Sequence, residues 1–339
     1  MGSISDVGGI LVGHHHRIDQ DVTLGAGWAS GTTVVLAPPG TIGAVDGRGG
    51  APGTRETDLL DPINTVRHVD AVVLSGGSAY GLAAADGVMT WLEQQDRGVA
   101  MDGGVVPIVP AAVIFDLPVG GWANRPTAEF GYAAAAAAGA QFGLGTVGAG
   151  VGARAGVLKG GVGTASTVLP DGVTVGALVI VNAAGDVVDP ATGLPWMTTL
   201  THEFGLVAPP ANQLAAYADL HTELSPLNTT IAVVATDAAL SKAACRRVAV
   251  AAHDGLARTI APCHTPLDGD TVFALATGAV TVEPDPKTPP AMSPETMLVA
   301  RIGAAAAEVL ARAVLVGVLA ADAVAGIPTY RDMLPGAFG

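Results

Sequence analysis

The segment Leu227–Val234, which reads L-N-T-T-I-A-V-V, places two threonines between a loop and an apolar run. A threonine at the mouth of a strand is an ordinary structural residue. It also has a chemical interpretation, in which the Thr229 hydroxyl attacks the Asn228 carbonyl and water then opens the resulting ester. The freed α-amine, with a reference pKa of about 7.7–8.0, could act as general base for the adjacent hydroxyl. Such a nucleophile would need no histidine.

A second candidate is His264–Phe273, in which Asp268 and Asp270 stand two residues apart as the chain enters an apolar run. Side chains at this spacing in an extended chain point the same way. Close like charges raise one carboxyl pKa unless a cation lies between them. The alternative is a turn in which Asp268-Gly269 supplies left-handed geometry. A calcium loop is a weaker alternative because the D-x-[DN]-x-[DN]-G spacing is absent.

The glycine-rich stretch Gly145–Ser166 contains Lys159, one of three lysines in the chain. A buried lysine near carboxylates could hold a threonine hydroxyl or an oxyanion. The alternative is a lysine at a surface turn. A match to G-x-G-x-x-G at 143–148 is weak, because it follows a predicted alanine-rich helix and not a strand.

Two further motifs suggest chemistry less strongly. Gly76–Leu82 is similar to a nucleophile elbow, but Tyr80 stands where the last glycine of G-x-S-x-G should be. We therefore expect Ser78 to cap a helix. His14-His15-His16 suggests a metal, yet consecutive side chains diverge and no carboxylate follows at ligand spacing. The sequence predicts a polar loop there and no metal site.

The elements that must position these residues alternate along the chain, which predicts a layered α/β fold with mixed sheets. Strands are predicted at Thr32–Leu36, Val72–Leu74, Val173–Val181, Thr230–Val234 and Thr271–Leu275. Helices are predicted at Ser78–Gln95, around Ala133–Ala138, at Ala238–Leu256 after an Asp237 cap, and from Ser293 to about Val324. The segment Thr201–Leu227 has a polar, proline-containing texture and is predicted to be an exposed connection.

Composition excludes several classes of function. The chain has 339 residues, and 16 Lys and Arg against 30 Asp and Glu give a net charge of −14. That balance argues against nucleic-acid and anionic-membrane binding. The start lacks the features of a signal peptide, and the apolar stretch Ala313–Ala321 is too short to span a bilayer. We therefore expect a cytoplasmic protein.

Taken together, several segments resemble the β-aminopeptidase family, which includes L-aminopeptidase/D-esterases and 6-aminohexanoate-oligomer (nylon-oligomer) endo-hydrolases. The resemblance covers nearly the whole chain. It is carried by Asp46–Gly50, Gly76–Leu82, Val113–Asp116, Gly145–Ser166, Val181-Asn182, Asn228–Thr230 and His264–Phe273.

The resemblance implies a four-layer αββα sandwich of the N-terminal-nucleophile type, in one domain spanning 1–339. It implies cleavage between Asn228 and Thr229 into 1–228 and 229–339. Thr229 would be the nucleophile for this cut and for amide hydrolysis. It also implies supporting roles for Lys159, Asn182, Asp268 and Asp270, no metal or organic cofactor, and a homo-oligomer, by resemblance a tetramer.

Specificity is less constrained by the resemblance. Phe115 stands where some relatives carry an aromatic hydroxyl, and we take Phe115 and Tyr80 as candidate substrate-binding residues. The acidic residue that holds a free amine in the aminopeptidase branch is replaced by the apolar Val113-Ile114. Threonine as nucleophile after asparagine favours the nylon-hydrolase branch. Two alternatives stay open: an acyltransferase of the ornithine acetyltransferase type, and an uncleaved relative that serves as a binding or scaffold protein.

Overall fold

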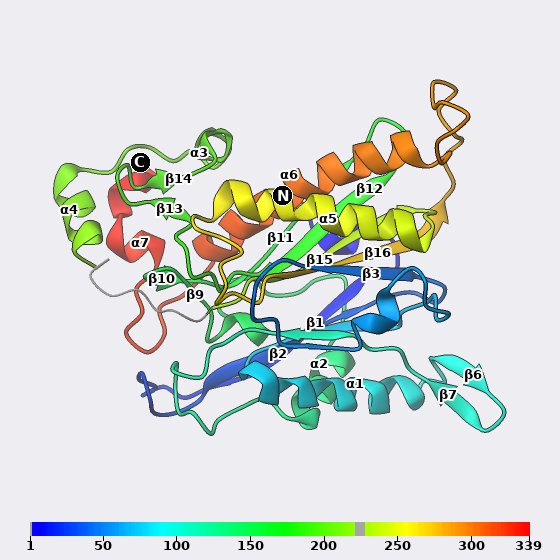
Figure 1. The fold of residues 1–339 in the computed structure, drawn as a ribbon. Coiled ribbons are helices and arrows are strands. Elements are labelled where there is room, and N and C mark those ends of the chain that lie inside the picture. Colours follow the sequence, from blue (N-terminus) through cyan, green and yellow to red (C-terminus); the bar gives the residue numbers. More distant parts are fainter. Residues whose placement is uncertain (1, 221–227) are drawn as a thin grey trace.

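Two five-stranded sheets lie face to face in the computed structural model, which describes residues 2–220 and 228–339 (Figure 1). The first sheet, in the order β1-β2-β5-β8-β4, is formed by Leu11–Ile18, Ala29–Leu36, Ala71–Ser75, Ala111–Val113 and Thr54–Arg55. The second, in the order β11-β12-β15-β16-β3, is formed by Val162–Val168, Thr174–Ile180, Ile231–Ala238, Thr271–Val280 and Ile42–Gly47. Both sheets are mixed, since β5–β8 and β15–β16 are parallel pairs in otherwise antiparallel sheets.

Helices cover the outer face of each sheet. The first sheet is covered by α1 (Ala84–Glu93) and α2 (Ala128–Ala136), and the second by α5 (Lys242–Thr259) and α6 (Thr296–Leu319) (Figure 1). The predicted αββα sandwich is therefore confirmed. Smaller elements gather near the C-terminus, at one end of the second sheet; they are β13 (Val188–Asp189), β14 (Leu194–Pro195), α3 (Thr198–Glu203), α4 (Ala211–Asp219) and α7 (Tyr330–Met333).

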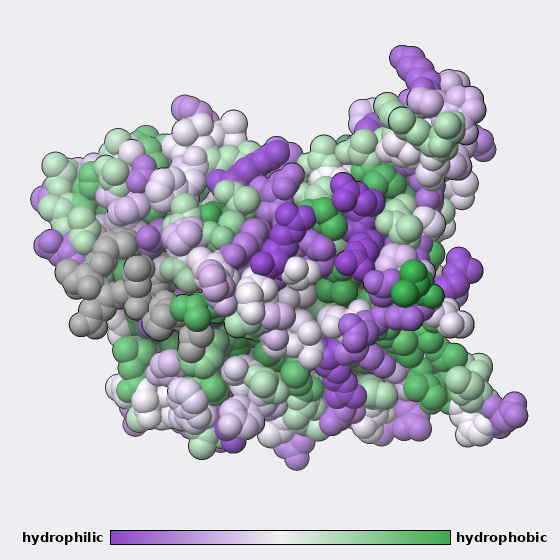
Figure 2. Space-filling view, in the orientation of Figure 1, coloured by the Kyte–Doolittle hydropathy of each residue, from purple (hydrophilic) through white to green (hydrophobic). Residues whose placement is uncertain are grey.

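The alternation of side chains along the strands divides the core into layers. In β15, Val233 joins the cluster between the two sheets, whereas Ala232 and Val234 join the cluster under α5 and α6. Small residues bring a helix backbone close to the sheet, because a Cβ on Gly163 of β11 would collide with the Ala313 carbonyl of α6. The outer surface of α5 is largely hydrophilic (Figure 2).

Several local predictions are wrong. Asp237 lies inside β15 and accepts a hydrogen bond from Thr174 N, while Ser241 caps α5 by accepting from Ala244 N. Ser78 does not cap a helix: Gly77, with φ at 84°, precedes a 3-10 turn that starts at Ser78 itself. The run His14–His16 lies within β1, because its strand pairs with β2 along its whole length.

The predicted exposed connection at Thr201–Leu227 contains the end of α3 and the whole of α4, and its residues 221–227 lie outside the described residues. The C-terminal helix ends at Leu319, five residues before the expected Val324. This helix, α6, is much longer than the apolar stretch 313–321 and is long and apolar enough to cross a membrane by length and composition alone. However, 72% of its most apolar window is buried inside the fold.

Two hairpins complete the described chain. The pair β6 (Val99–Met101) and β7 (Gly104–Val106) projects from the side of the first sheet (Figure 1). The pair β9 (Arg154–Ala155) and β10 (Leu158–Lys159) lies at the end of the second sheet. There Ala155 forms a parallel bridge with Ala183, three residues after the end of β12. This second hairpin brings the glycine-rich segment to the start of β15.

Candidate active site

Thr229 lies directly before β15, and the predicted site forms around it. Its amide N–H donates to Asn182 O at 2.6 Å, and its hydroxyl donates to the carbonyl oxygen of Asn228 at 2.6 Å. The same hydroxyl oxygen accepts from Gly269 N at 3.1 Å. The Asn228 side chain is held in turn by a 3.0 Å hydrogen bond from its Nδ2 to Ala183 O. The hydroxyl therefore lies beside the carbonyl that it would have to attack.

Asn182 follows the fully buried strand β12 and is itself buried. Its Oδ1 accepts a hydrogen bond from Arg154 N at 2.9 Å, and this contact fixes which end of the amide is the donor. The Nδ2 end makes a long 3.4 Å contact with Phe115 O. Because that amide carries two N–H bonds, these contacts leave one of them available to a further acceptor.

Asp268 and Asp270 lie next to Thr229 because β16 runs parallel to β15 and the pairing extends back to an Asn228–Asp268 bridge. Asp270 Oδ1 accepts from Thr230 N at 2.7 Å, which fixes the backbone just after the nucleophile. Burial raises the pKa of Asp268, and the Asp270 charge raises it further. This is the coupling that two carboxylates at this spacing were expected to show.

His264 is the cation beside this pair. Its Nδ1 lies 2.8 Å from Asp270 Oδ2, and its backbone N–H donates to the same oxygen at 3.0 Å. Burial alone lowers the pKa of His264, but the hydrogen bond and charge of Asp270, assisted by Cys263, raise it to about 9. His264 was not predicted as a site residue, although it belongs to the motif that contains both carboxylates.

Lys159 is fully buried, so the alternative of a surface turn is wrong. Its Nζ donates to Gly150 O at 2.7 Å and to Gly160 O at 2.8 Å, and within the described residues it forms no hydrogen bond with Thr229. Burial lowers the pKa of Lys159 to about 7, against the opposing charges of Asp116 and Asp322. The structure thus places this ammonium inside the β9–β10 hairpin, bonded to backbone carbonyls and not to Thr229.

Asp116 is a buried acid that the sequence analysis did not select. It accepts hydrogen bonds from Gly77 N at 2.6 Å and from the Ser30 hydroxyl at 2.7 Å. Burial raises the pKa of Asp116 to about 6, although both hydrogen bonds and Lys159 lower it. The charges of Asp116 and Lys159 therefore couple the first sheet to the β9–β10 hairpin.

Three aromatic side chains follow the ends of the first-sheet strands β5 and β8. Phe115 is partly buried and lies edge-on to Trp122, with ring centroids 6.1 Å apart. Tyr80 is 56% exposed, and the Arg125 guanidinium carbon lies 3.7 Å above its ring. Phe115 is joined to Asn182 by its backbone carbonyl, whereas Tyr80 forms no hydrogen bond with Thr229 within the part of the chain that the structure describes. We call Phe115, Trp122 and Tyr80 the aromatic wall.

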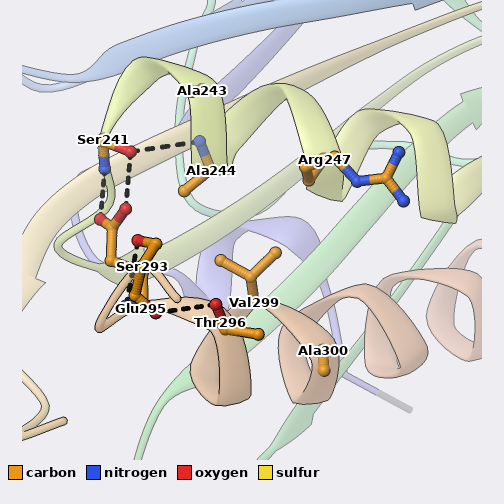
Figure 3. A pocket seen from close by; sticks show the side chains of 9 residues that line it. All are labelled: Ser241, Ala243, Ala244, Arg247, Ser293, Glu295, Thr296, Val299 and Ala300. Carbon is orange, nitrogen blue, oxygen red and sulfur yellow. Dashed lines mark hydrogen bonds between the residues drawn. The ribbon is translucent and has the colours of Figure 1, made fainter. Parts of the chain in front are cut away.

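A hollow of about 440 Å³ lies elsewhere, between the first turns of α5 and α6 (Figure 3). There both Glu295 carboxylate oxygens accept hydrogen bonds from Ser241, and the Arg247 side chain extends away from that pair. This hollow contains none of the predicted site residues. Within residues 2–220 and 228–339, no group of three or more His, Cys, Asp or Glu side chains is placed to hold a metal ion.

Comparison with known proteins agrees with this geometry. An uncharacterized aminopeptidase of Mycobacterium bovis is 73% identical over 343 residues, across the full length of both chains. A 6-aminohexanoate-oligomer endohydrolase of Kocuria sp. is 32% identical over 300 residues, covering 84% of this chain and 79% of that relative. The expected resemblance is confirmed by both.

Solved structures share the fold. A Burkholderia sp. beta-aminopeptidase matches with a TM-score of 0.70 and 24% identity, covering 97% of this chain and 90% of that one. The l-aminopeptidase d-ala-esterase/amidase of Ochrobactrum anthropi, described as a variant of the ntn hydrolase fold, matches with a TM-score of 0.68 and 22% identity, covering 95% and 86%. The sequence pattern of peptidase family S58 matches residues 2–331. This chain therefore belongs to peptidase family S58 and is an amide-bond hydrolase.

Proposed function

We propose that the chain cuts itself between Asn228 and Thr229 and then hydrolyses amides with Thr229 as its N-terminal nucleophile. The observation that supports this most directly is the position of the Thr229 hydroxyl, 2.6 Å from the Asn228 carbonyl oxygen and 3.1 Å from the Gly269 amide nitrogen. The first contact sets the hydroxyl against the bond to be cut. The second stabilises negative charge as it develops on the hydroxyl oxygen.

The cut proceeds through an ester. Thr229 Oγ1 forms a bond to the Asn228 carbonyl carbon, the C–N bond breaks, and the nitrogen takes the hydroxyl proton. Water then hydrolyses the ester, which leaves a carboxylate on Asn228 and restores the hydroxyl on a chain that begins at Thr229. We assign Asp268 to assist this proton transfer, because it is bridged to Asn228 at the junction and because burial and the Asp270 charge raise its pKa above the ordinary value of a carboxyl.

The cut converts the Thr229 nitrogen into a base. Asn182 O, which accepts the peptide N–H at 2.6 Å, would accept one hydrogen of the new amine and so orient its lone pair toward the hydroxyl. The amine takes the Oγ1 proton, Oγ1 bonds to the substrate carbonyl carbon, and Asn182 Nδ2 stabilises the oxyanion. The leaving amine takes the proton, and water releases the acyl group from Oγ1.

The supporting residues keep this geometry in place. Asp270 holds the Thr230 amide, and the buried Lys159 ties the Gly150 and Gly160 carbonyls of the glycine-rich segment together. The aromatic wall suits the methylene chains of a substrate better than its charged ends. We therefore propose short peptides or linear ω-amino-acid oligomers as substrates, the second class in keeping with the name of the Kocuria relative.

Intact-mass analysis of the purified protein tests the proposal. We expect two species, residues 1–228 and 229–339, with the first allowing for removal of Met1. Thr229→Ala should remain one chain and lose turnover of an amide panel by at least about a thousandfold, since the nucleophile and its base belong to the same residue. Thr230→Ala serves as the matched control and should still be cut. Cleavage at this junction in Thr229→Ala would contradict the assignment.

We also propose a cytoplasmic homo-tetramer, an expectation that rests on the family resemblance. Light scattering coupled to size exclusion measures the assembly directly. A monomer at micromolar concentration would overturn this part of the proposal without affecting the chemistry.

A further inference from the structure

Arg154 is an unpaired cation beside the candidate site. Its side chain is partly buried, and its Nε is buried with no hydrogen-bond partner among the described residues. No carboxylate within 2–220 or 228–339 forms an ion pair with it. Burial lowers the pKa of Arg154, with no neighbouring acid to offset the effect. A guanidinium stays charged in proteins, so this site carries a positive charge that the described chain leaves uncompensated.

The strand pattern shows which way Arg154 points. In the β9–β10 hairpin, Arg154 lies opposite Lys159 and Ala155 lies opposite Leu158. Ala155 and Leu158 both belong to the core between the second sheet and its helices. Because successive side chains on a strand point to opposite faces, Arg154 and Lys159 share the other face.

Asn182 points to that same face. Its neighbours Val181 and Ala183 both belong to the core under α5 and α6, which leaves the Asn182 side chain on the opposite side. The Arg154 backbone N–H is bonded to Asn182 Oδ1, and Asn182 O is bonded to Thr229 N. Arg154 is thus two hydrogen bonds away from the nucleophile, on the face where the oxyanion donor lies.

The other two cations of the candidate site, His264 and Lys159, already have partners. The His264 ring contacts Asp270, and the Lys159 ammonium is faced by Asp116 and Asp322 and donates to two carbonyls. Arg154 alone among these described groups has donors left for a ligand. Its planar fork matches a carboxylate, to which guanidinium groups bind in a bidentate manner.

We infer that Arg154 binds a free carboxylate of the substrate, so that the protein selects amides whose chain ends in a carboxylate close to the scissile bond. The inference rests on the proposed function and specifies that the preferred substrate carries a free carboxylate. It makes peptides and ω-amino-acid oligomers with a free acid end better substrates than the same molecules with an amidated end.

The test compares the linear dimer of 6-aminohexanoate with its C-terminal carboxamide. Wild-type protein should favour the free acid by about 10- to 100-fold in kcat/KM, the size of a charge-assisted hydrogen-bonded contact. Arg154→Gln should lose most of this preference through a raised KM for the acid. Arg154→Lys, which keeps the charge without the fork, should retain part of it. Equal use of both dimers by wild type, or an unchanged preference in Arg154→Gln, would overturn the inference.

Controls separate this result from misfolding and from failure of the proposed function. Intact mass gives the cut fraction of each variant, and rates are compared per cut molecule. Arg312→Gln makes the same change on α6, where the arginine pairs with Glu203 on the surface, and should leave the preference unchanged. If wild type hydrolyses neither dimer, the proposed substrate class is wrong. A thermal shift then still tests Arg154: free 6-aminohexanoate should raise the Tm of wild type more than that of Arg154→Gln, and equal shifts overturn the inference.

Discussion

The two sheets supply the candidate site in different ways. The second sheet brings Thr229, Asn182 and Asp270 to the ends of adjacent strands, and hydrogen bonds to backbone groups hold all three. The first sheet supplies the aromatic wall, of which Trp122 and Tyr80 are each 56% exposed. The groups proposed to react, which need a fixed geometry, are held by hydrogen bonds to the backbone. The groups proposed to select the substrate are exposed side chains. Chemistry and selection should therefore be separable by mutation.

Among the residues that support Thr229, the largest effect is expected at Asp270. In Asp270→Asn, an amide N–H₂ would replace one of two oxygens that together accept from Thr230 N, His264 N and the His264 ring. At least one buried donor loses its partner. We expect at least a hundredfold loss in self-cleavage rate and in kcat, measured by timed intact mass and amide turnover.

A surface carboxylate provides the control for that change. Asp171→Asn removes a surface ion pair with Arg301 and should leave cleavage and turnover within about twofold of wild type. Near-normal cleavage in Asp270→Asn would show that the backbone around Thr229 does not need this carboxylate, and the contrast between the sheets would weaken.

Gly269→Ala should displace the Thr229 hydroxyl without changing any charged group in the candidate site. A Cβ at this position would lie 2.9 Å from the Thr229 hydroxyl oxygen and 2.9 Å from Ala51 O. The Thr229 hydroxyl and the Ala51 backbone must both shift, so we expect about a 10- to 100-fold fall in kcat together with a fall in Tm. Gly103→Ala, where no atom lies within 4 Å of the new Cβ, is the matched substitution and should have no effect on either quantity.

The His264–Asp270 pair predicts a pH dependence of stability. Because folding raises the pKa of His264 from about 6.5 to about 9, its contribution is fully present below pH 6.5 and is lost as pH rises through 9. One pKa unit corresponds to about 1.4 kcal/mol, so the loss is about 1 to 3 kcal/mol. Lys159, whose pKa is lowered to about 7, gives a slope of the opposite sign above pH 7.

Urea unfolding between pH 6 and 10 separates the contributions of His264 and Lys159 to the free energy of unfolding. The difference between wild type and His264→Gln isolates the histidine, since Lys159 is common to both proteins. This difference should shrink as pH rises from 6.5 to 9. A difference that stays constant over this range would mean that the ring does not gain a proton on folding.

The smallest effect is expected at the aromatic wall. Trp122→Ala removes an exposed ring that touches Phe115 and none of the reacting groups. We expect KM to rise about three- to tenfold, kcat to stay within about twofold, and self-cleavage to be normal. A large fall in kcat would show that the first sheet also positions the reacting atoms, which would break the division proposed above.

Local patterns in the sequence singled out Thr229, Asp268 and Asp270, because the relationships among neighbouring residues are short-range. Asn182 was selected through the family resemblance, and the structure places it directly after the buried strand β12. The Asp116–Lys159 coupling could not be predicted in this way, because it depends on how a first-sheet loop meets a hairpin 43 residues further along the chain. Ser78 was misjudged because Gly77 adopts φ at 84° and places the turn one residue earlier.

Arg154 shows the same limit from the other side. Arg154 belongs to the glycine-rich segment Gly145–Ser166, but the local sequence does not distinguish an arginine at a surface turn from one on the face of the candidate site. The direction of its side chain follows from its neighbours Ala155 and Leu158, which belong to the core under α5 and α6. That core forms only when the two helices pack on the sheet. Similarly, α4 was not predicted within the polar segment Thr201–Leu227. Most helical stability in proteins comes from tertiary packing, and the buried residue of α4 is Tyr217.

The strand order of the second sheet determines how the protein could come apart after the proposed cut. Residues before Thr229 supply β11 and β12 on one flank and β3 on the other, and they enclose β15 and β16, which come after it. Neither fragment could leave without breaking a sheet, so the halves should stay together indefinitely under native conditions. Once melted, however, they would have to find each other as a bimolecular encounter. A protein that folded as one polypeptide would then recover only at a rate set by its own concentration.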